Sequence, residues 1–361
     1  MEKFGAAVCL GSLVAIVGAF GACSSPAPSA GFQGSDSDAS AQANTPDAAA
    51  DDSATAAPSS DDGGLGGWHP GAGADAGDAA TGDGGVATTT LTTITASVGP
   101  IALMPNEETT VCITMRLPNT DSVYIPRITV DLAPGSHHLV VYRSMATEEN
   151  LTPTPCTAFQ GILMGQAVPL MITEKLADDL TFPQGVALKI EPHQMIELEA
   201  HYINTGATTL QGSGSAHFET VPVTTANVIE SDLGFFGTLG IVIPPGVQSN
   251  GPLFVKGLAG THGFAVTTHE HRLGTDFKIW AATSATDVNH TPLADTTDWA
   301  NPPLYRLSPE LDFDGTNGLA YQCTWNNTTG QVVTFGESAL QEMCFMWMYY
   351  YPSQGFDMRF Q

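Results

Sequence analysis

Basic residues are scarce in this chain. Of its 361 residues, 11 are Lys or Arg and 37 are Asp or Glu, so the formal net charge is −26 at pH 7. A chain this acidic is repelled by nucleic-acid phosphates and by anionic lipid headgroups. We therefore expect no nucleic-acid partner and no polybasic contact with a membrane.

Long amphipathic helices and several common catalytic motifs are also missing. The best helical window, Leu163–Leu180, is interrupted by Pro169. No C-x-x-C pair is present, which argues against a zinc ribbon or a thioredoxin-type site. The absence of Gly-x-Ser-x-Gly and Walker-type loops argues against a serine hydrolase and against nucleotide binding.

The first 22 residues read as an export signal. Lys3 supplies a positive start, an apolar run over residues 4–20 follows, and Phe20-Gly21-Ala22-Cys23 resembles the end of a bacterial lipoprotein signal. The resemblance implies acylation of Cys23 and, with Ser24, anchoring in the outer membrane of a Gram-negative-type bacterium, facing the periplasm or the cell surface. An ordinary secretory signal with a chance cysteine is the alternative, and a short, Gly-rich run disfavours a spanning helix.

Residues 23–92 are rich in Ala, Ser, Gly and Asp and contain almost no large apolar side chains. Such a segment buries too little surface to offset its ordering entropy, so we expect a disordered tether. The remaining chain is long enough for two domains, which we place at residues 93–220 and 221–361.

The folded part is dominated by short, β-branched or alternating runs separated by turn clusters such as Pro134-Gly135 and Asn204-Thr205-Gly206. This pattern predicts an all-β protein of two tandem antiparallel β-sandwich, jelly-roll-like domains. The clearest expected strands are 124–130, 138–142, 196–202, 277–280, 319–325 and 331–335.

Four cysteines remain once Cys9 of the signal and Cys23 are set aside. An even number in an exported protein predicts two disulfides, and the sequence alone leaves all three pairings open. The four are Cys112, Cys156, Cys323 and Cys344.

Two histidine pairs have spacings that suit a metal. His269 and His271 are two residues apart, so on a strand both imidazoles point to one face. His137 and His138 are adjacent and can share one ion only where a strand bends or begins, which the preceding Pro134-Gly135-Ser136 allows. Alone, each pair is about as frequent as chance predicts in a chain with ten histidines, and a solvent-facing pair is the plain alternative.

The order of these pairs among other segments is more specific. From about residue 95 to the C-terminus, the chain resembles the copper type II, ascorbate-dependent monooxygenases, the family of peptidylglycine α-hydroxylating monooxygenase and dopamine β-monooxygenase. The segments that carry the resemblance are Thr110–Pro118, Ser136–Tyr142, Leu198–Tyr202, Ile243–Gly246, Thr268–Gly274, and Glu342–Cys344 leading into Tyr349-Tyr350.

The resemblance implies two copper ions per chain and a reaction in which O₂ and ascorbate, or another one-electron reductant, hydroxylate a C–H bond. It assigns the catalytic copper, where O₂ reacts, to His269, His271 and Met343. It assigns a second copper, which supplies an electron across the gap between domains, to His137, His138 and His201. It also implies the disulfides Cys112–Cys156 and Cys323–Cys344.

The substrate pocket departs from the peptide-hydroxylating members. These hold a peptide carboxylate with an arginine two residues before the His-x-His pair and a tyrosine four after the methionine, where this chain has Thr267 and Trp347. Threonine cannot form arginine's bidentate clamp, so a small neutral or cationic organic substrate fits better. We expect a monomer with O₂ and a small molecule as partners. A catalytically silent copper-binding surface lipoprotein is the alternative.

Overall fold

The structure, a computed structural model, describes residues 91–336, 338 and 340–361. The predicted signal peptide, Cys23 and nearly all of the predicted tether lie outside these residues. The described residues belong to one compact unit. Among them, no helix has the length and apolar character needed to cross a bilayer.

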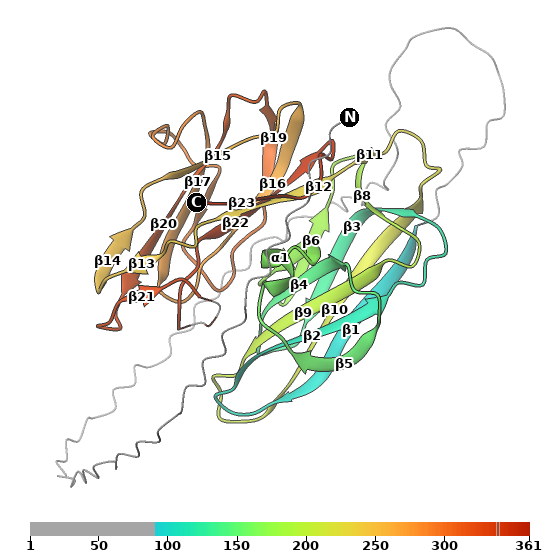
Figure 1. Cartoon of the computed structure of the whole chain (residues 1–361), viewed down its shortest axis with the longest axis horizontal. Coiled ribbons are helices and arrows are strands. Elements are labelled where there is room, and N and C mark those ends of the chain that lie inside the picture. Colours follow the sequence, from blue (N-terminus) through green and yellow to red (C-terminus); the bar gives the residue numbers. More distant parts are fainter. Residues whose placement is uncertain (1–90, 337, 339) are drawn as a thin grey trace, which may run out of the picture. The chain divides into compact units, whose positions relative to one another are not determined.

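The first group of strands forms two sheets (Figure 1). One sheet has the order β1-β10-β3-β8-β11, with β7 also paired to β3, and the other has the order β5-β2-β9-β4-β6. The strands are β1 (Thr92–Leu103), β2 (Glu108–Arg116), β3 (Val123–Leu132), β4 (Ser136–Ser144), β5 (Asn150–Pro155), β6 (Ala167–Thr173), β7 (Ala177–Thr181), β8 (Val186–Ile190), β9 (Met195–Ile203), β10 (Leu210–Pro222) and β11 (Ile229–Glu230).

The second group of strands begins at Asp232 and forms the sheets β19-β16-β22-β12-β23 and β14-β20-β17-β18, with β15 beside β20, and the pair β13-β21. The strands are β12 (Asp232–Gly237), β13 (Val242–Ile243), β14 (Gly246–Ser249), β15 (Leu253–Lys256), β16 (Thr261–His269), β17 (Gly274–Ala282), β18 (Ala294–Thr296), β19 (Tyr305–Phe313), β20 (Gly318–Asn327), β21 (Val333–Thr334), β22 (Phe345–Tyr351) and β23 (Asp357–Phe360).

The predicted all-β class is confirmed. Within the described chain the only helix is α1 (Gln160–Leu163), and the rejected helical window contains β6 and β7 instead. Most strand pairs are antiparallel as expected, but β11 pairs with β8 and β23 with β12 in parallel. The predicted boundary after residue 220 falls inside β10, and the division into two domains stays a prediction.

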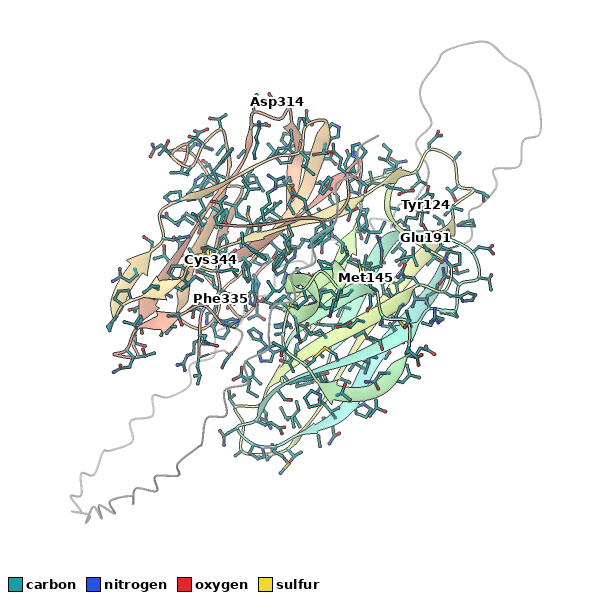
Figure 2. All side chains as sticks on the ribbon, in the orientation of Figure 1. Tyr124, Met145, Glu191, Asp314, Phe335 and Cys344 are labelled. Atoms are coloured by element: carbon teal, nitrogen blue, oxygen red, sulfur yellow. A yellow bond between two sulfur atoms is a disulfide. The ribbon has the colours of Figure 1, made fainter. Side chains whose placement is uncertain are left out.

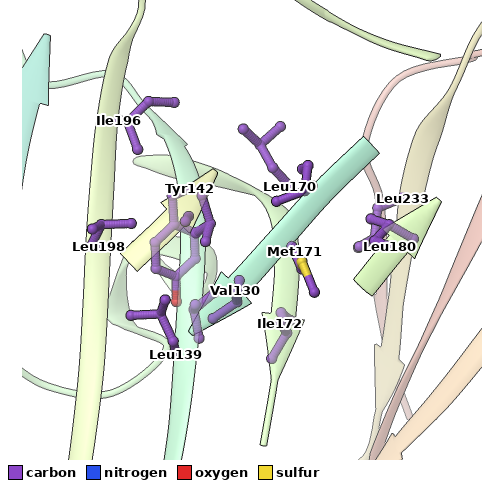
Figure 3. Packing of buried hydrophobic residues seen from close by; sticks show 14 of the residues in the cluster. Val130, Leu139, Tyr142, Leu170, Met171, Ile172, Leu180, Ile196, Leu198 and Leu233 are labelled. Atoms are coloured by element: carbon purple, nitrogen blue, oxygen red, sulfur yellow. The ribbon is translucent and has the colours of Figure 1, made fainter. Parts of the chain in front are cut away.

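Strand β22 is buried on both faces, which explains its uninterrupted apolar sequence. Alternate residues of a strand point to opposite faces. Phe345, Trp347 and Tyr349 pack into the core of the first strand group, together with Leu233 of β12. Met346, Met348 and Tyr350 pack into the core of the second group. The apolar core therefore continues from one group into the other, and Figure 3 shows Leu233 beside Leu180.

Both disulfides implied by the resemblance are present. Cys112 of β2 is bonded to Cys156, and Cys323 of β20 is bonded to Cys344. Figure 2 shows the side chains of Cys344 and Phe335 among the second group of strands. The second bridge fixes the residue that follows Met343, one of the predicted ligands.

Candidate metal centre

Strand register brings the first three predicted ligands together. In the antiparallel pair β4–β9, His138 lies directly opposite His201, and the register shifts between Ser136 and His138. The extra residue at this shift is His137, so the bend that an adjacent pair requires is present. Gly135, with φ of +91°, supplies the turn just before it, as expected from the sequence.

The three imidazoles converge. One ligand nitrogen from each of His137, His138 and His201 lies within 4.8 Å of the others, and all three residues are buried. The Nδ1 atoms of His137 and His138 are 3.1 Å apart. Nitrogens of the three rings are therefore close enough together to bind one ion.

Burial keeps these imidazoles neutral, as metal binding requires. Burial, with the neighbouring histidines, holds the pKa of His137 and of His138 well below the usual range. Burial also lowers the pKa of His201, against the opposing effect of Glu108. The Nε2 of His201 contacts Glu108 Oε1 at 3.1 Å, which leaves Nδ1 as the free ligand atom.

The second predicted set lies at strand ends and in loops. His269 is the last residue of β16, His271 follows two residues later, and Met343 lies two residues before β22. All three are at most 1% exposed. The Nδ1 of His271 donates to the carbonyl oxygen of Gln341 at 3.0 Å, and the Nδ1 of His269 is hydrogen-bonded to Glu174. Burial lowers the pKa of His269 and of His271 to about 3.

Glu342 connects two parts of this second set. Its carboxylate accepts hydrogen bonds from the backbone N–H groups of His271 at 3.1 Å and Leu273 at 2.8 Å. Because Glu342 precedes Met343, these bonds tie the His-x-His turn to the segment that carries the methionine. The Cys323–Cys344 bridge holds the same segment from its other side.

The two sets form one cluster. The ring centroids of His137 and His269 are 6.2 Å apart, those of His137 and His271 are 6.3 Å apart, and those of His138 and His269 are 5.9 Å apart. The resemblance implies an electron crossing a gap between domains, but here imidazoles of the two sets are in contact. Phe159 packs against both His138 and His269, and Trp299 packs against His137.

The donor set fits a metal. Imidazole binds both copper oxidation states, and a thioether such as that of Met343 favours Cu(I). Buried polar atoms without partners are rare in folded proteins, so a group of them indicates a missing ligand. Within the described chain, the buried imidazole nitrogens without a hydrogen-bond partner are His137 Nε2, His138 Nε2, His201 Nδ1 and His269 Nε2.

The predicted substrate-pocket residues, Thr267 and Trp347, lie opposite each other in the β16–β22 pairing. They line one cavity together with Glu174 and Asp178, and its volume is about 10 Å³. This is about the space of one water molecule, so any larger occupant requires the walls to separate.

Sequence reasoning missed three carboxylates of this centre. Glu199 lies two residues before His201 on the same face of β9, and its Oε1 is 3.7 Å from His138 Nε2. The two-residue spacing of Glu199 and His201 could have indicated Glu199 from the sequence, and the position of Glu342 next to Met343 could have indicated Glu342. Glu174 had none, since it lies 95 residues from His269 in the sequence.

One comparison with known proteins agrees with the resemblance seen in the sequence. The chain matches, over residues 254–360, the C-terminal domain of the copper type II ascorbate-dependent monooxygenases. This range includes His269, His271 and Met343. A search of curated proteins finds no match to this chain.

Similarity to solved structures is weak. The major capsid protein P2 from bacteriophage PM2 is 9% identical, with 74% of this chain and 100% of that chain covered and a TM-score of 0.32. A structure of Sulfolobus Turreted Icosahedral Virus is 9% identical, with 71% of this chain and 58% of that chain covered and a TM-score of 0.20. A tail fiber protein from an E. coli phage is 9% identical, with 72% of this chain and 38% of that chain covered and a TM-score of 0.21. TM-scores this low support no conclusion about fold or function. The match over residues 254–360 supports the resemblance of this chain to the copper type II ascorbate-dependent monooxygenases.

Proposed function

We propose that this chain is a copper-dependent monooxygenase that hydroxylates a C–H bond of a small organic substrate, using O₂ and ascorbate or another one-electron reductant. The observation that carries the proposal is the cluster of five buried imidazoles from the two predicted ligand sets. One copper would be held by His137, His138 and His201, and the catalytic copper by His269, His271 and Met343.

Copper, when bound, supplies the one-electron redox chemistry and the reaction with O₂. The protein contributes neutral imidazoles, because burial disfavours their protonated form. Met343 adds a soft thioether that favours the reduced metal. Phe159 and Trp299 cover the rings and limit access of water to them.

The cavity lined by Thr267 and Trp347 supports a neutral or cationic substrate. Among the described residues that line it, Glu174 and Asp178 are acidic and none is basic. An anionic substrate would find no charge-assisted hydrogen bond there. Thr267 and Trp347 are the residues we propose to face the substrate once the cavity opens.

A copper-holding protein without turnover is the second candidate, and the small volume of this cavity favours it. The test is metal analysis of the purified chain, followed by O₂ consumption with ascorbate over a panel of small neutral molecules and amines. Two copper ions with substrate-stimulated O₂ uptake support the monooxygenase. Two copper ions without stimulated uptake support the second candidate, and absence of copper overturns both.

Met343→Ala tests the assignment of the catalytic copper. We expect this variant to lose one copper and all stimulated O₂ uptake while it keeps the copper of the three histidines, because the thioether belongs to one site alone. Retention of both ions with full affinity for Cu(I) contradicts the assignment.

We also propose that the chain is an exported, outer-membrane-anchored lipoprotein that acts as a monomer and contacts the membrane through its lipid alone. The sequence Gly21-Ala22-Cys23 supports this, and the two disulfides suit an oxidising compartment. Labelling with a radioactive fatty acid should mark the wild type and spare Cys23→Ser. Equal labelling of both proteins contradicts the anchor.

A further inference from the structure

We propose that Glu174 is a positioning residue for the catalytic copper. It fixes the imidazole of His269 so that Nε2 faces the metal, and it makes this site depend on the first group of strands. The inference rests on the proposed function, since it concerns how one of the proposed ligands is held.

The contact between Glu174 and His269 is isolated from solvent. The Oε1 atom of Glu174 is hydrogen-bonded to Nδ1 of His269, and the two side chains are 1% and 0% exposed. A neutral imidazole that donates its Nδ1 proton presents the lone pair of Nε2. In the described chain, the Nε2 of His269 is buried without a hydrogen-bond partner. The bond therefore selects the ligand atom.

His271 provides an internal comparison. Its Nδ1 also donates, but to the neutral carbonyl of Gln341 at 3.0 Å, which lies two residues before Met343. Both rings of the His-x-His pair are thus held at Nδ1. The two partner groups differ in kind, a carboxyl group and a backbone carbonyl, and in origin, because Glu174 belongs to the connection between β6 and β7 of the first strand group. Of these two bonds, the one made by His269 connects the two strand groups.

Burial raises the pKa of the Glu174 carboxyl well above its usual range, and a copper ion on Nε2 of His269 would favour the charged form, which accepts the Nδ1 proton. A carboxylate bonded to a ligand histidine makes the imidazole a stronger donor to the metal than a carbonyl does. A stronger donor stabilises Cu(II) relative to Cu(I), which opposes the effect of the Met343 thioether. We infer that Glu174 and Met343 together set the reduction potential of this copper.

The local structure holds the carboxylate in place. Thr173, the last residue of β6, donates through its hydroxyl to Asp178 at 2.7 Å and accepts from the backbone N–H of Lys175 at 3.2 Å. These bonds form a tight turn around Glu174. The backbone of Glu174 is thereby fixed before any metal binds.

The test compares Glu174→Gln and Glu174→Ala in the full chain. Glutamine keeps an acceptor oxygen and removes the charge, so we expect both coppers to remain and the midpoint potential of the catalytic copper to rise. Alanine removes the acceptor, so we expect its copper affinity to fall about 10- to 100-fold. The copper of the three histidines should bind as in the wild type. Affinities are measured by titration of each copper ion against a competing chelator.

Glu197→Gln is the control, because it replaces another acidic side chain of the first strand group, one that is half-buried and accepts a hydrogen bond from Ser144. We expect it to leave the potential and the Cu(II) electron paramagnetic resonance spectrum of the catalytic copper unchanged. Equal losses at both coppers in Glu174→Ala would mean a general structural effect and would overturn the inference. So would a potential in Glu174→Gln equal to that of the wild type.

The failure of this inference can be separated from the failure of the proposed function. If the wild type binds no copper, the proposed function fails. If it binds two copper ions and hydroxylates a substrate while both Glu174 variants behave as the wild type does, only the role of Glu174 fails. Thermal unfolding of the metal-free variants checks that each is folded.

Discussion

The two sets of proposed ligands are held in different ways. His137, His138 and His201 lie on paired strands, so the hydrogen bonds between β4 and β9 determine where their imidazoles meet. His269 ends β16 opposite Phe345 of β22, but His271 lies beyond the strand, where no such pairing fixes it. Acceptors from separate segments hold that second set instead.

This difference predicts which substitutions should disturb each set of ligands. Strand register is maintained by many backbone bonds, and a single substitution in the sheet seldom moves it. The second set depends on a few individual groups, Glu174, the carbonyl of Gln341, the carboxylate of Glu342 and one disulfide. Changes far from the metal should therefore affect the second set much more than the first.

The largest effect expected is loss of one copper at a time. His201→Ala should remove the copper of the three histidines and leave the other, and His271→Ala should do the reverse, because each site loses a ligand. Metal analysis of the two purified variants measures this. If either substitution removes both coppers, the five imidazoles act as one site and the comparison fails.

Breaking the Cys323–Cys344 bridge should affect stability and metal binding together. Replacing both cysteines with serine should lower the free energy of unfolding by about 3 kcal/mol, because the unfolded chain loses a constraint. The affinity for Cu(I) at the Met343 site should also fall, since Cys344 follows Met343. Denaturant unfolding and Cu(I) titration measure the two effects.

The control replaces both Cys112 and Cys156 with serine. Its stability should fall by a similar amount, yet the Cu(I) affinity of the Met343 site should stay at the wild-type value. A similar fall in affinity in both double variants would mean that the loss reflects stability alone.

Glu342→Ala should have the next largest effect. It leaves the buried N–H groups of His271 and Leu273 without their acceptor, which costs about 2 kcal/mol in the free energy of unfolding. Glu342→Gln retains one acceptor oxygen and should lose less. Urea unfolding of both variants gives the comparison, and an unchanged midpoint in Glu342→Ala would contradict the role given to this carboxylate.

The smallest difference between the sites should be their response to pH. Because burial lowers the pKa of His269 and of His271 to about 3, copper should compete with protons at their site only well below pH 6. In the metal-free protein the same shift stabilises the fold above pH 6.5. That stability is lost as the pH falls from 6.5 toward 3, since only the unfolded imidazoles take up protons. Equilibrium dialysis with copper from pH 7 to pH 5 should show little release, and a release midpoint near 6.5 would indicate exposed ligands.

Much of the fold could be predicted because its signals are local. Alternation and turn clusters indicated the strands, and Pro134-Gly135-Ser136 indicated the bend that lets His137 and His138 share a site. The ligand set and the disulfide pairing needed the resemblance, since spacing alone left them open. Glu174 could not be found, because it lies 95 residues from His269 in the sequence and belongs to the other strand group.

Because β22 is buried on both faces, the second strand group should not be stable when it is expressed without the first. A fragment that starts near residue 221 would keep Phe345, Trp347, Tyr349 and Leu233 but lose the core into which they pack. A row of large apolar side chains exposed on one sheet face is an aggregation hazard. Expression of this fragment alone should thus yield insoluble material, and a chain for metal studies should begin near Thr92.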